Sequence, residues 1–133
     1  MTRHECRIIA MKLLFSSLDN ENFDFETTQK ELLLDINATD EDVDFINQIY
    51  QCAKENEIEI ISKLSQTLKG YEWGRIYKVD KCLLILALAE MSELKITPPK
   101  IVISEILNIA KEYSTPNSAK FINGILANFV GEV

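Results

Sequence analysis

Two arginines near the start of the chain are the first side chains whose spacing suggests chemistry. Arg3 and Arg7 lie four residues apart, so a helix would present both on one face, where they could contact an anion. Two cations at a helix start also oppose the helix dipole, at a cost of roughly a few tenths of a kcal/mol each. Position alone favours solvated surface arginines over an anion contact.

Other acidic and aromatic residues that could take part in binding are better explained by structural roles. Asp40, Glu41 and Asp42 follow Thr39, which is typical of a capped helix start with acids in its first turn. A metal site would need a converging loop, which the pattern does not contain, and no metal ligand is predicted. Trp73 lies in a polar connector and indicates a packing anchor more than a stacking platform.

The sequence contains no recognisable enzyme motif. A nucleophile elbow, a phosphate loop, a dinucleotide fingerprint and a His-Glu-x-x-His motif are all missing, so we predict no catalytic residue and no cofactor, while carboxylate acid–base chemistry stays open. The single histidine is His4, and the cysteines are odd in number and far apart, which disfavours zinc or disulfides and fits a reducing cytoplasm. The cysteines are Cys6, Cys52 and Cys82. We expect no signal peptide, because Lys12 interrupts the early apolar stretch.

The net charge of −7 argues against a tight, purely electrostatic binder of nucleic acid. The acidity is local, however. Residues 19–48 contain ten acids and one lysine, whereas residues 1–18 carry a net charge of +2 and residues 49–133 are balanced. One face of the protein could therefore still be basic.

The element that must position these residues is Val79 to Leu94. From Cys82 to Ala89 it contains no polar side chain, which predicts a helix covered on all sides. The run is too short to cross a membrane, which needs about 20 apolar residues. It therefore predicts the central helix of an all-helical fold.

Apolar spacing and helix-start chemistry predict about seven helices in a single domain over residues 1–133. Gly70 is expected to end the fourth helix, and Thr97 to cap the sixth with proline at its first position. The predicted helices begin and end as follows: Thr2 or Arg3 to about Leu18, Thr27 or Thr28 to Leu34, Thr39 to about Ala53, Ile58 to Gly70, Val79 to Leu94, Pro99 to about Ala110, and from Thr115-Pro116 to about Val130.

Four stretches resemble one known family from end to end. Asn117-Ser118-Ala119-Lys120-Phe121-Ile122-Asn123-Gly124-Ile125-Leu126 resembles the C-terminal signature of the NusB family of transcription antitermination factors. The central helix, the segment from Pro99 to Lys111, and Arg7 to Phe15 also resemble the corresponding family segments. Residues 19–70 match only in helix pattern.

The resemblance implies two packed helical sub-bundles, about residues 1–70 and 71–133. It also implies a non-catalytic function in the cytoplasm. Members of the family pair with the ribosomal protein NusE, and the pair binds the boxA segment of nascent ribosomal RNA transcripts as single-stranded RNA. The complex joins RNA polymerase and other Nus factors in elongation. An exposed apolar partner surface would also allow a homodimer.

The resemblance assigns RNA contacts to residues at both ends of the chain. Arg3, His4 and Arg7 match the family's arginine-rich start, where phosphate contact is expected. Of the two later residues, Lys120 could hold a phosphate beside backbone N–H groups, and Phe121 could stack on a base or belong to the core.

Three further residues have roles that the resemblance leaves open. Asn117 could contact a base edge or cap the last helix. Asp80 and Lys81, at the start of the central helix, are candidates for the NusE contact, although Asp80 could simply compensate the helix dipole. Within the last signature, Gly124 is expected to mark a close helix approach.

The sequence departs from the family in ways that keep a second hypothesis open. The N-terminus has fewer arginines than is usual, and Ile85 replaces a usual arginine in the central helix. We therefore expect weak RNA binding by the isolated chain, with the partner supplying affinity. The alternative is a protein–protein scaffold of the same fold with weak or no RNA binding. The related domain of RNA cytosine methyltransferases is disfavoured, because 133 residues leave no room for a cofactor-binding α/β domain.

Overall fold

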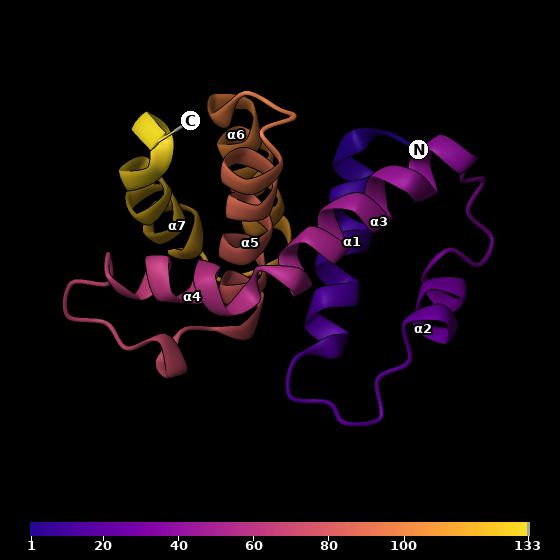
Figure 1. The fold of residues 1–133 in the computed structure, drawn as a ribbon, viewed down its shortest axis with the longest axis horizontal. Coiled ribbons are helices and arrows are strands. Elements are labelled where there is room, and N and C mark those ends of the chain that lie inside the picture. Colours follow the sequence, from indigo (N-terminus) through magenta and orange to yellow (C-terminus); the bar gives the residue numbers. More distant parts are fainter. Residues whose placement is uncertain (133) are drawn as a thin grey trace.

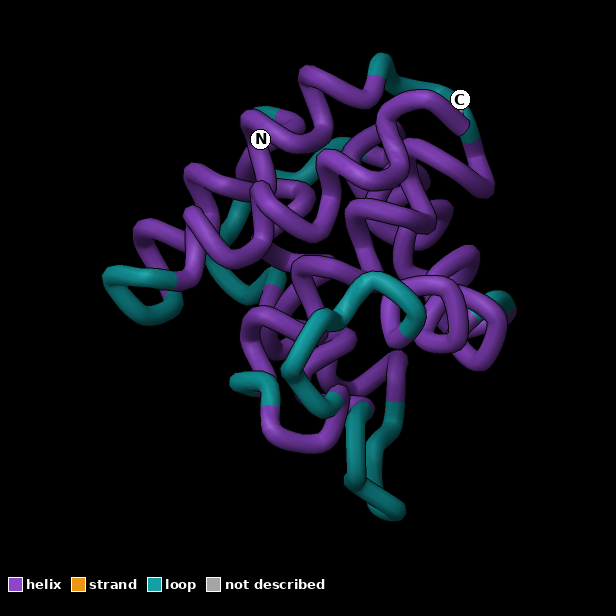
Figure 2. Tube along the Cα trace, turned by 90° about the vertical axis from the view of Figure 1, so that its left-hand side faces the viewer, coloured by secondary structure: helices purple, strands orange, loops and turns teal. Residues whose placement is uncertain are grey.

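The computed structural model describes residues 1–132, and this part of the chain folds into helices joined by loops, with no strand (Figure 2). The α-helices are α1 (Arg3–Ser17), α2 (Phe25–Leu32), α3 (Asp40–Glu55), α4 (Glu57–Ser65), α5 (Lys78–Leu88), α6 (Pro99–Tyr113) and α7 (Ser118–Leu126). Three short helical segments accompany them: η1 (Trp73–Arg75), η2 (Ala89–Leu94) and η3 (Ala127–Glu132). The predicted all-helical fold with seven helices is confirmed.

The helices form two packed groups (Figure 1). Helices α1, α2 and α3 pack together on one side, and α5, α6 and α7 on the other. Helix α4 contacts both α3 and α5 and so links the groups, while α5 also packs directly on α1. The boundary expected near residue 70 stays a prediction.

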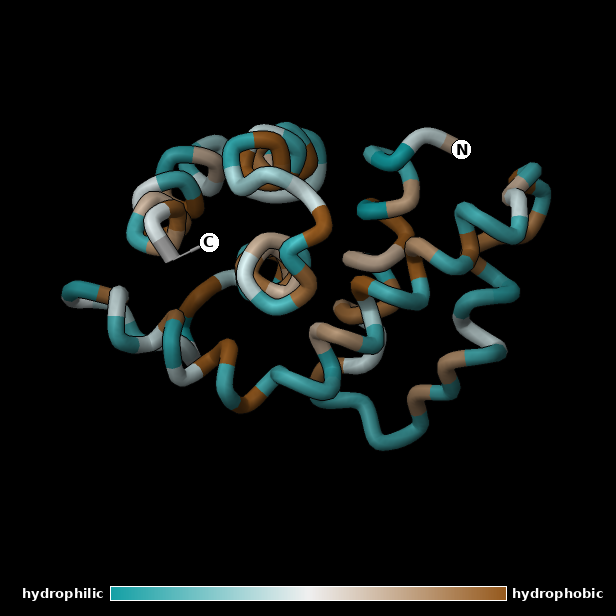
Figure 3. Tube along the Cα trace, turned by 45° about the horizontal axis from the view of Figure 1, so that its top comes forward, coloured by the Kyte–Doolittle hydropathy of each residue, from teal (hydrophilic) through white to brown (hydrophobic). Residues whose placement is uncertain are grey.

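The centre of the fold is α5. Every side chain from Cys82 to Ala89 is buried, as the uninterrupted apolar run predicted. Figure 3 colours the chain by hydropathy, with hydrophobic and hydrophilic residues alternating along the helices and mostly hydrophilic residues in the loop between α1 and α2. The buried side chains of both groups join in one core. Within residues 1–132, no helix is long and apolar enough to cross a membrane.

The central helix does not continue regularly to Leu94. After Leu88 the chain widens into the π-helical segment η2, closed by a bond from the Lys95 N–H to the Glu90 carbonyl of 3.1 Å. Lys95 then takes a left-handed conformation with φ of 55° and ends the segment. Such insertions alter which way side chains point, and functional or buried polar residues often accompany them. Here the segment contains the buried Glu90.

Helix ends agree with the sequence at some positions and differ at others. Thr39 caps α3, as predicted, and does so in a reciprocal pair with Asp42; α6 begins with a proline, as predicted, but with Pro99, one residue later than a Thr97 cap implies. Helix α2 begins earlier than predicted because Asp24 caps it through the Thr27 N–H.

Two predicted end signals were misplaced. Helix α4 ends at Ser65, and Gly70 lies in the following loop with a left-handed φ of 80°. Thr97 does not cap α6, whose cap position is Pro98.

Candidate nucleic-acid interface

The N-terminal basic cluster is tied to acidic residues of other helices. Arg7 is buried, and its Nε and Nη2 donate to the Glu90 carboxylate at 2.8 and 2.6 Å. Burial by itself would lower the pKa of Arg7, but hydrogen bonds and the charge of Glu90 raise it above its usual value. Two of the Arg7 guanidinium nitrogens are therefore already hydrogen-bonded to Glu90. The phosphate contact expected of Arg7 stays a prediction.

Arg3 and His4 are more accessible than Arg7. The Arg3 guanidinium lies over the Phe45 ring at 4.2 Å and 3.8 Å from the exposed Glu41 carboxylate. His4 Nδ1 lies 2.8 Å from Glu105 on α6. The Arg3–Glu41 pair is an exposed surface contact, and pairs of this kind contribute little and exchange easily. The Arg3 side chain can therefore turn to an incoming anion, whereas His4 is partly buried beside Glu105.

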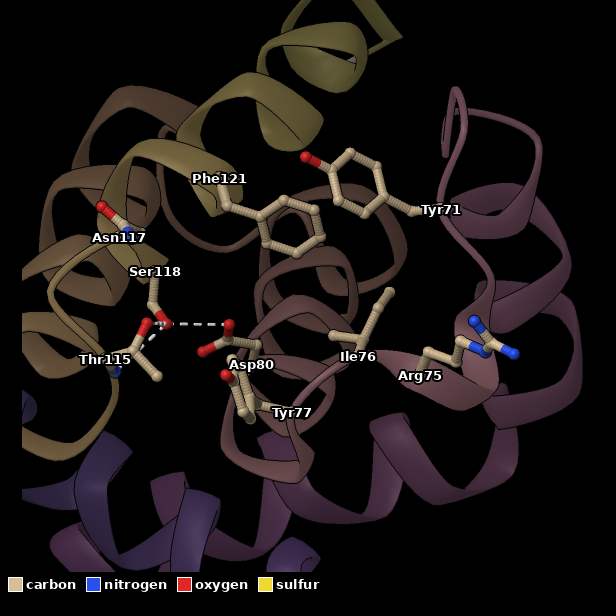
Figure 4. Close-up of a pocket in the computed structure, with 9 residues that line it drawn as sticks. All are labelled: Tyr71, Arg75, Ile76, Tyr77, Asp80, Thr115, Asn117, Ser118 and Phe121. Carbon is tan, nitrogen blue, oxygen red and sulfur yellow. Dashed lines mark hydrogen bonds between the residues drawn. The ribbon is translucent and has the colours of Figure 1, made fainter.

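A second group of predicted residues surrounds an aromatic hollow between α7 and the loop before α5 (Figure 4). The hollow measures about 200 Å³ and is bounded by the rings of Tyr71 and Phe121, which meet edge to face with centroids 5.1 Å apart. Tyr71 is exposed and Phe121 is half-buried against the core. Phe121 therefore belongs partly to the core, as one alternative expected, and it also lines the hollow, while its stacking on an RNA base stays a prediction.

A buried polar network fixes the floor of this hollow. The Asp80 carboxylate accepts hydrogen bonds from the hydroxyls of Ser114, at 2.6 Å, and Ser118, at 2.9 Å. Asp80 is only 2% exposed, so its charge is satisfied inside the fold. This network joins the first turn of α5 to the first turn of α7. The partner contact expected of Asp80 stays a prediction, but the carboxylate is already engaged.

The other predicted residues, Asn117, Lys120 and Lys81, differ in exposure, and of the three only Asn117 lines this hollow. Lys120 and Asn117 are exposed, and the Asn117 side chain makes no capping hydrogen bond to α7, so its amide does not serve as the expected cap. Lys81 is half-buried, with its ammonium 5.7 Å from the centre of the Trp73 ring. Trp73 packs against the core, as the sequence indicated.

The predicted RNA-binding residues of α7 lie together in the structure, but those of the N-terminal segment lie elsewhere. Asn117 and Phe121 line one hollow, whereas Arg3, His4 and Arg7 contact α3, α6 and η2. Tyr71 is a site residue that the sequence did not single out. Its only sequence signal was a tyrosine directly after a loop glycine, and its pairing with Phe121 depends on tertiary packing.

A separate apolar hollow lies where α1, α2, α5 and α6 meet. Phe15 and Tyr113 are partly exposed there, and Val79 at the start of α5 lies between them and the core. Two lysines lie over its aromatic rings: Lys78 Nζ is 4.3 Å from the Phe15 ring centre and Lys12 Nζ is 5.3 Å from that of Tyr113. An apolar centre with a polar rim is the usual composition of a protein–protein interface.

Comparison with known proteins identifies the family. The model of the NusB family matches residues 4–131. The chain belongs to the NusB family. The transcription antitermination protein NusB of Clostridium novyi is 31% identical over 131 residues, covering 98% of both chains.

Solved NusB structures share the fold. The structure of T. maritima NusB superposes with a TM-score of 0.89 at 31% identity, covering 99% of this chain and 92% of that one. A structure of the antitermination factors NusB and NusE in complex with double-stranded RNA gives a TM-score of 0.83 at 24% identity over the full length of both chains. The family resemblance read from the sequence is thus confirmed.

Proposed function

We propose that this NusB-family protein is a non-catalytic, cytoplasmic transcription antitermination factor. It binds boxA-type single-stranded RNA of nascent ribosomal RNA transcripts as a heterodimer with NusE, within the elongation complex of RNA polymerase and other Nus factors. The proposal is supported by the antitermination proteins it resembles and by the NusB–NusE–RNA complex that shares its fold.

The observation that carries the RNA-binding part is the aromatic hollow. Two adjacent rings, Tyr71 and Phe121, can stack on unpaired bases, which is how proteins commonly hold single-stranded RNA. Arg75 lines the same hollow and its guanidinium points outward, where a backbone phosphate would pass (Figure 4).

Charge at the hollow also favours an anionic ligand. The chain as a whole carries −7, yet only one carboxylate lines the hollow, Asp80, and it is buried and accepts hydrogen bonds from two hydroxyls. Lys120 follows on the next face of α7. A phosphate here would lie near Arg75 and Lys120, and it would compete with the exposed Glu72 carboxylate, which lies 3.5 Å from Arg75 Nε.

We assign the remaining predicted contacts in the same framework. Arg3 and His4 contact phosphates at the N-terminal cluster, and Asn117 contacts a base edge beside Phe121. Arg7 supports this cluster by fixing α1 against Glu90. NusE docks on the apolar hollow of Phe15, Val79 and Tyr113, and the contact expected of Lys81 would lie apart from this hollow, beside Trp73.

A titration of a boxA-type RNA, with and without NusE, at two salt concentrations tests the proposal. We expect Tyr71→Leu to weaken binding about tenfold, since stacking on one base contributes roughly 1–3 kcal/mol. Tyr71→Phe is the matched control and keeps wild-type binding, because the ring is retained. Absence of RNA binding by wild-type protein under both conditions would overturn the proposal.

The N-terminal cluster supports one alternative function. The Arg7 guanidinium is hydrogen-bonded to Glu90, and His4 faces Glu105. The N-terminal segment therefore presents fewer free basic side chains than its sequence suggests. A protein–protein scaffold with the NusB fold would use the Phe15 surface alone. Such a scaffold would bind NusE with wild-type affinity and show no RNA binding in the titration above.

A further inference from the structure

Gly124, in the middle of α7, has no packing reason to be glycine. A Cβ built at this position meets no atom within 4 Å, so the close helix approach expected from the sequence is wrong. The residue is exposed and its backbone is not left-handed. Glycine lowers helix stability relative to alanine, so packing and backbone conformation both leave this choice unexplained.

Gly124 lines a second hollow, of about 650 Å³, on the far side of the aromatic pair. This hollow lies between α7 and the segment 67–71, and it shares Tyr71, Asn117 and Phe121 with the first hollow. The two rings thus form a ridge with a hollow on either side. A single strand that stacks on the ridge can continue into the second hollow, because the two hollows adjoin at these rings.

The charges of the second hollow suit a phosphate backbone. Lys69 comes from the loop and Lys120 from α7, so cations stand on both walls. Neither lysine takes part in an ion pair among the residues the structure describes, and no carboxylate lines this hollow. Both ammonium groups therefore remain available to an anion.

We infer that the second hollow is an RNA subsite in which the sugar–phosphate backbone passes directly over Gly124 between Lys69 and Lys120. The missing side chain lets the backbone approach the helix closely, which is a recurrent use of glycine at ligand sites. The inference rests on the proposed function and extends it by a subsite and two residues, Lys69 and Gly124.

Gly124→Ala separates this role from a structural one. The substitution raises the melting temperature, because alanine favours the helix and its Cβ meets no neighbour, yet it weakens binding of a boxA-type RNA in the presence of NusE about fivefold or more. Asn123→Ala, at the adjacent exposed position outside the hollow, is the control and leaves RNA binding unchanged. A lower melting temperature for Gly124→Ala would overturn the inference, because glycine would then be structural.

A lysine substitution tests the subsite by its charge. Lys69→Gln reduces the slope of log affinity against log salt by about one, as expected for one lost phosphate contact. Lys111→Gln, an exposed lysine on α6, is the matched control and leaves the slope unchanged.

The same titrations distinguish failure of the subsite from failure of the function. Wild-type RNA affinity in both Gly124→Ala and Lys69→Gln, with weakened binding in Tyr71→Leu, would overturn the subsite and leave the proposed function standing. No RNA binding by the wild-type protein would overturn both.

Discussion

Arg7 and Glu90 form a buried two-point ion pair between α1 and the π-helical segment η2. The Nε–Oε1 and Nη2–Oε2 distances are 2.8 and 2.6 Å, and the two residues are 5% and 1% exposed. Removing one partner leaves the other charge buried without compensation. We expect Arg7→Ala and Glu90→Ala each to lower the free energy of unfolding by about 3–5 kcal/mol in chemical denaturation.

The double replacement Arg7→Met with Glu90→Leu removes both charges and keeps apolar volume. It should be clearly more stable than either alanine variant, since replacing a buried pair by apolar residues is often neutral or stabilising. A double variant as unstable as the sum of the two single ones would contradict a coupled pair.

The same double variant tests Arg7 in RNA binding. With both charges gone and the fold kept, the salt slope of RNA affinity should equal that of the wild type, because Glu90 already occupies the guanidinium. A slope lower by about one would instead restore Arg7 as a phosphate contact.

These residues show what the sequence could predict. The run from Cys82 to Ala89 allowed only one outcome, because it offers no face to solvent, and its burial was predicted correctly. Arg7 carried no such signal. Its partner lies 83 residues away and reaches it through a π-helical widening that periodicity does not encode.

The site shows the same limit. The motif at Asn117–Leu126 indicated Lys120 and Phe121, but Tyr71 joins them only through the packing of a loop without periodic pattern. Asp80 stood at a helix start, where an exposed carboxylate is usual, and its serine partners were not foreseeable from spacing. Tertiary contacts between distant polar residues account for most of what was missed.

Ser118 couples the two helices below the aromatic hollow. Ser118→Ala removes one donor from the buried Asp80 carboxylate and should lower the free energy of unfolding by about 1–3 kcal/mol. The double variant Ser118→Ala with Asp80→Ala should lose less free energy of unfolding than the sum of the losses in the two single variants, because both changes remove the same hydrogen bond. Full additivity in a double-mutant cycle would argue against this coupling.

The capping pair of α3 predicts a pH dependence. The Thr39 backbone N–H donates a hydrogen bond to the Asp42 carboxylate, and this bond, followed by the Thr39 side chain and the nearby N-terminal ammonium, lowers the pKa of Asp42 below its ordinary value of 3.8. The ionised carboxylate therefore stabilises the fold above that value, and this contribution is lost as the pH falls through the lower pKa of the folded state. Asp42→Asn should lower the melting temperature at about pH 7, and the difference from wild type should shrink progressively as the pH is lowered below 3.8.

Asp44→Asn provides the control for this measurement. Asp44 lies in the same helix and has no side-chain hydrogen bond in the part of the chain that the structure describes. Its substitution should leave the melting temperature nearly unchanged across this pH range. A destabilisation by Asp42→Asn that persists at low pH would show that the charge is not responsible.

The apolar hollow at the start of α5 makes a prediction about the partner. Phe15 is 37% exposed, so its ring is only partly used by the core and is available to another protein. We expect Phe15→Ala to weaken NusE binding in calorimetry by about tenfold or more, since partly buried aromatics dominate interface energies. Ile58→Ala, at a position 87% exposed on α4 and outside this hollow, should bind NusE like the wild type.

Because the aromatic hollow lies elsewhere, RNA binding measured without NusE should be equal in Phe15→Ala and wild type. Parallel loss of NusE and RNA binding would place both ligands on one surface and contradict this division.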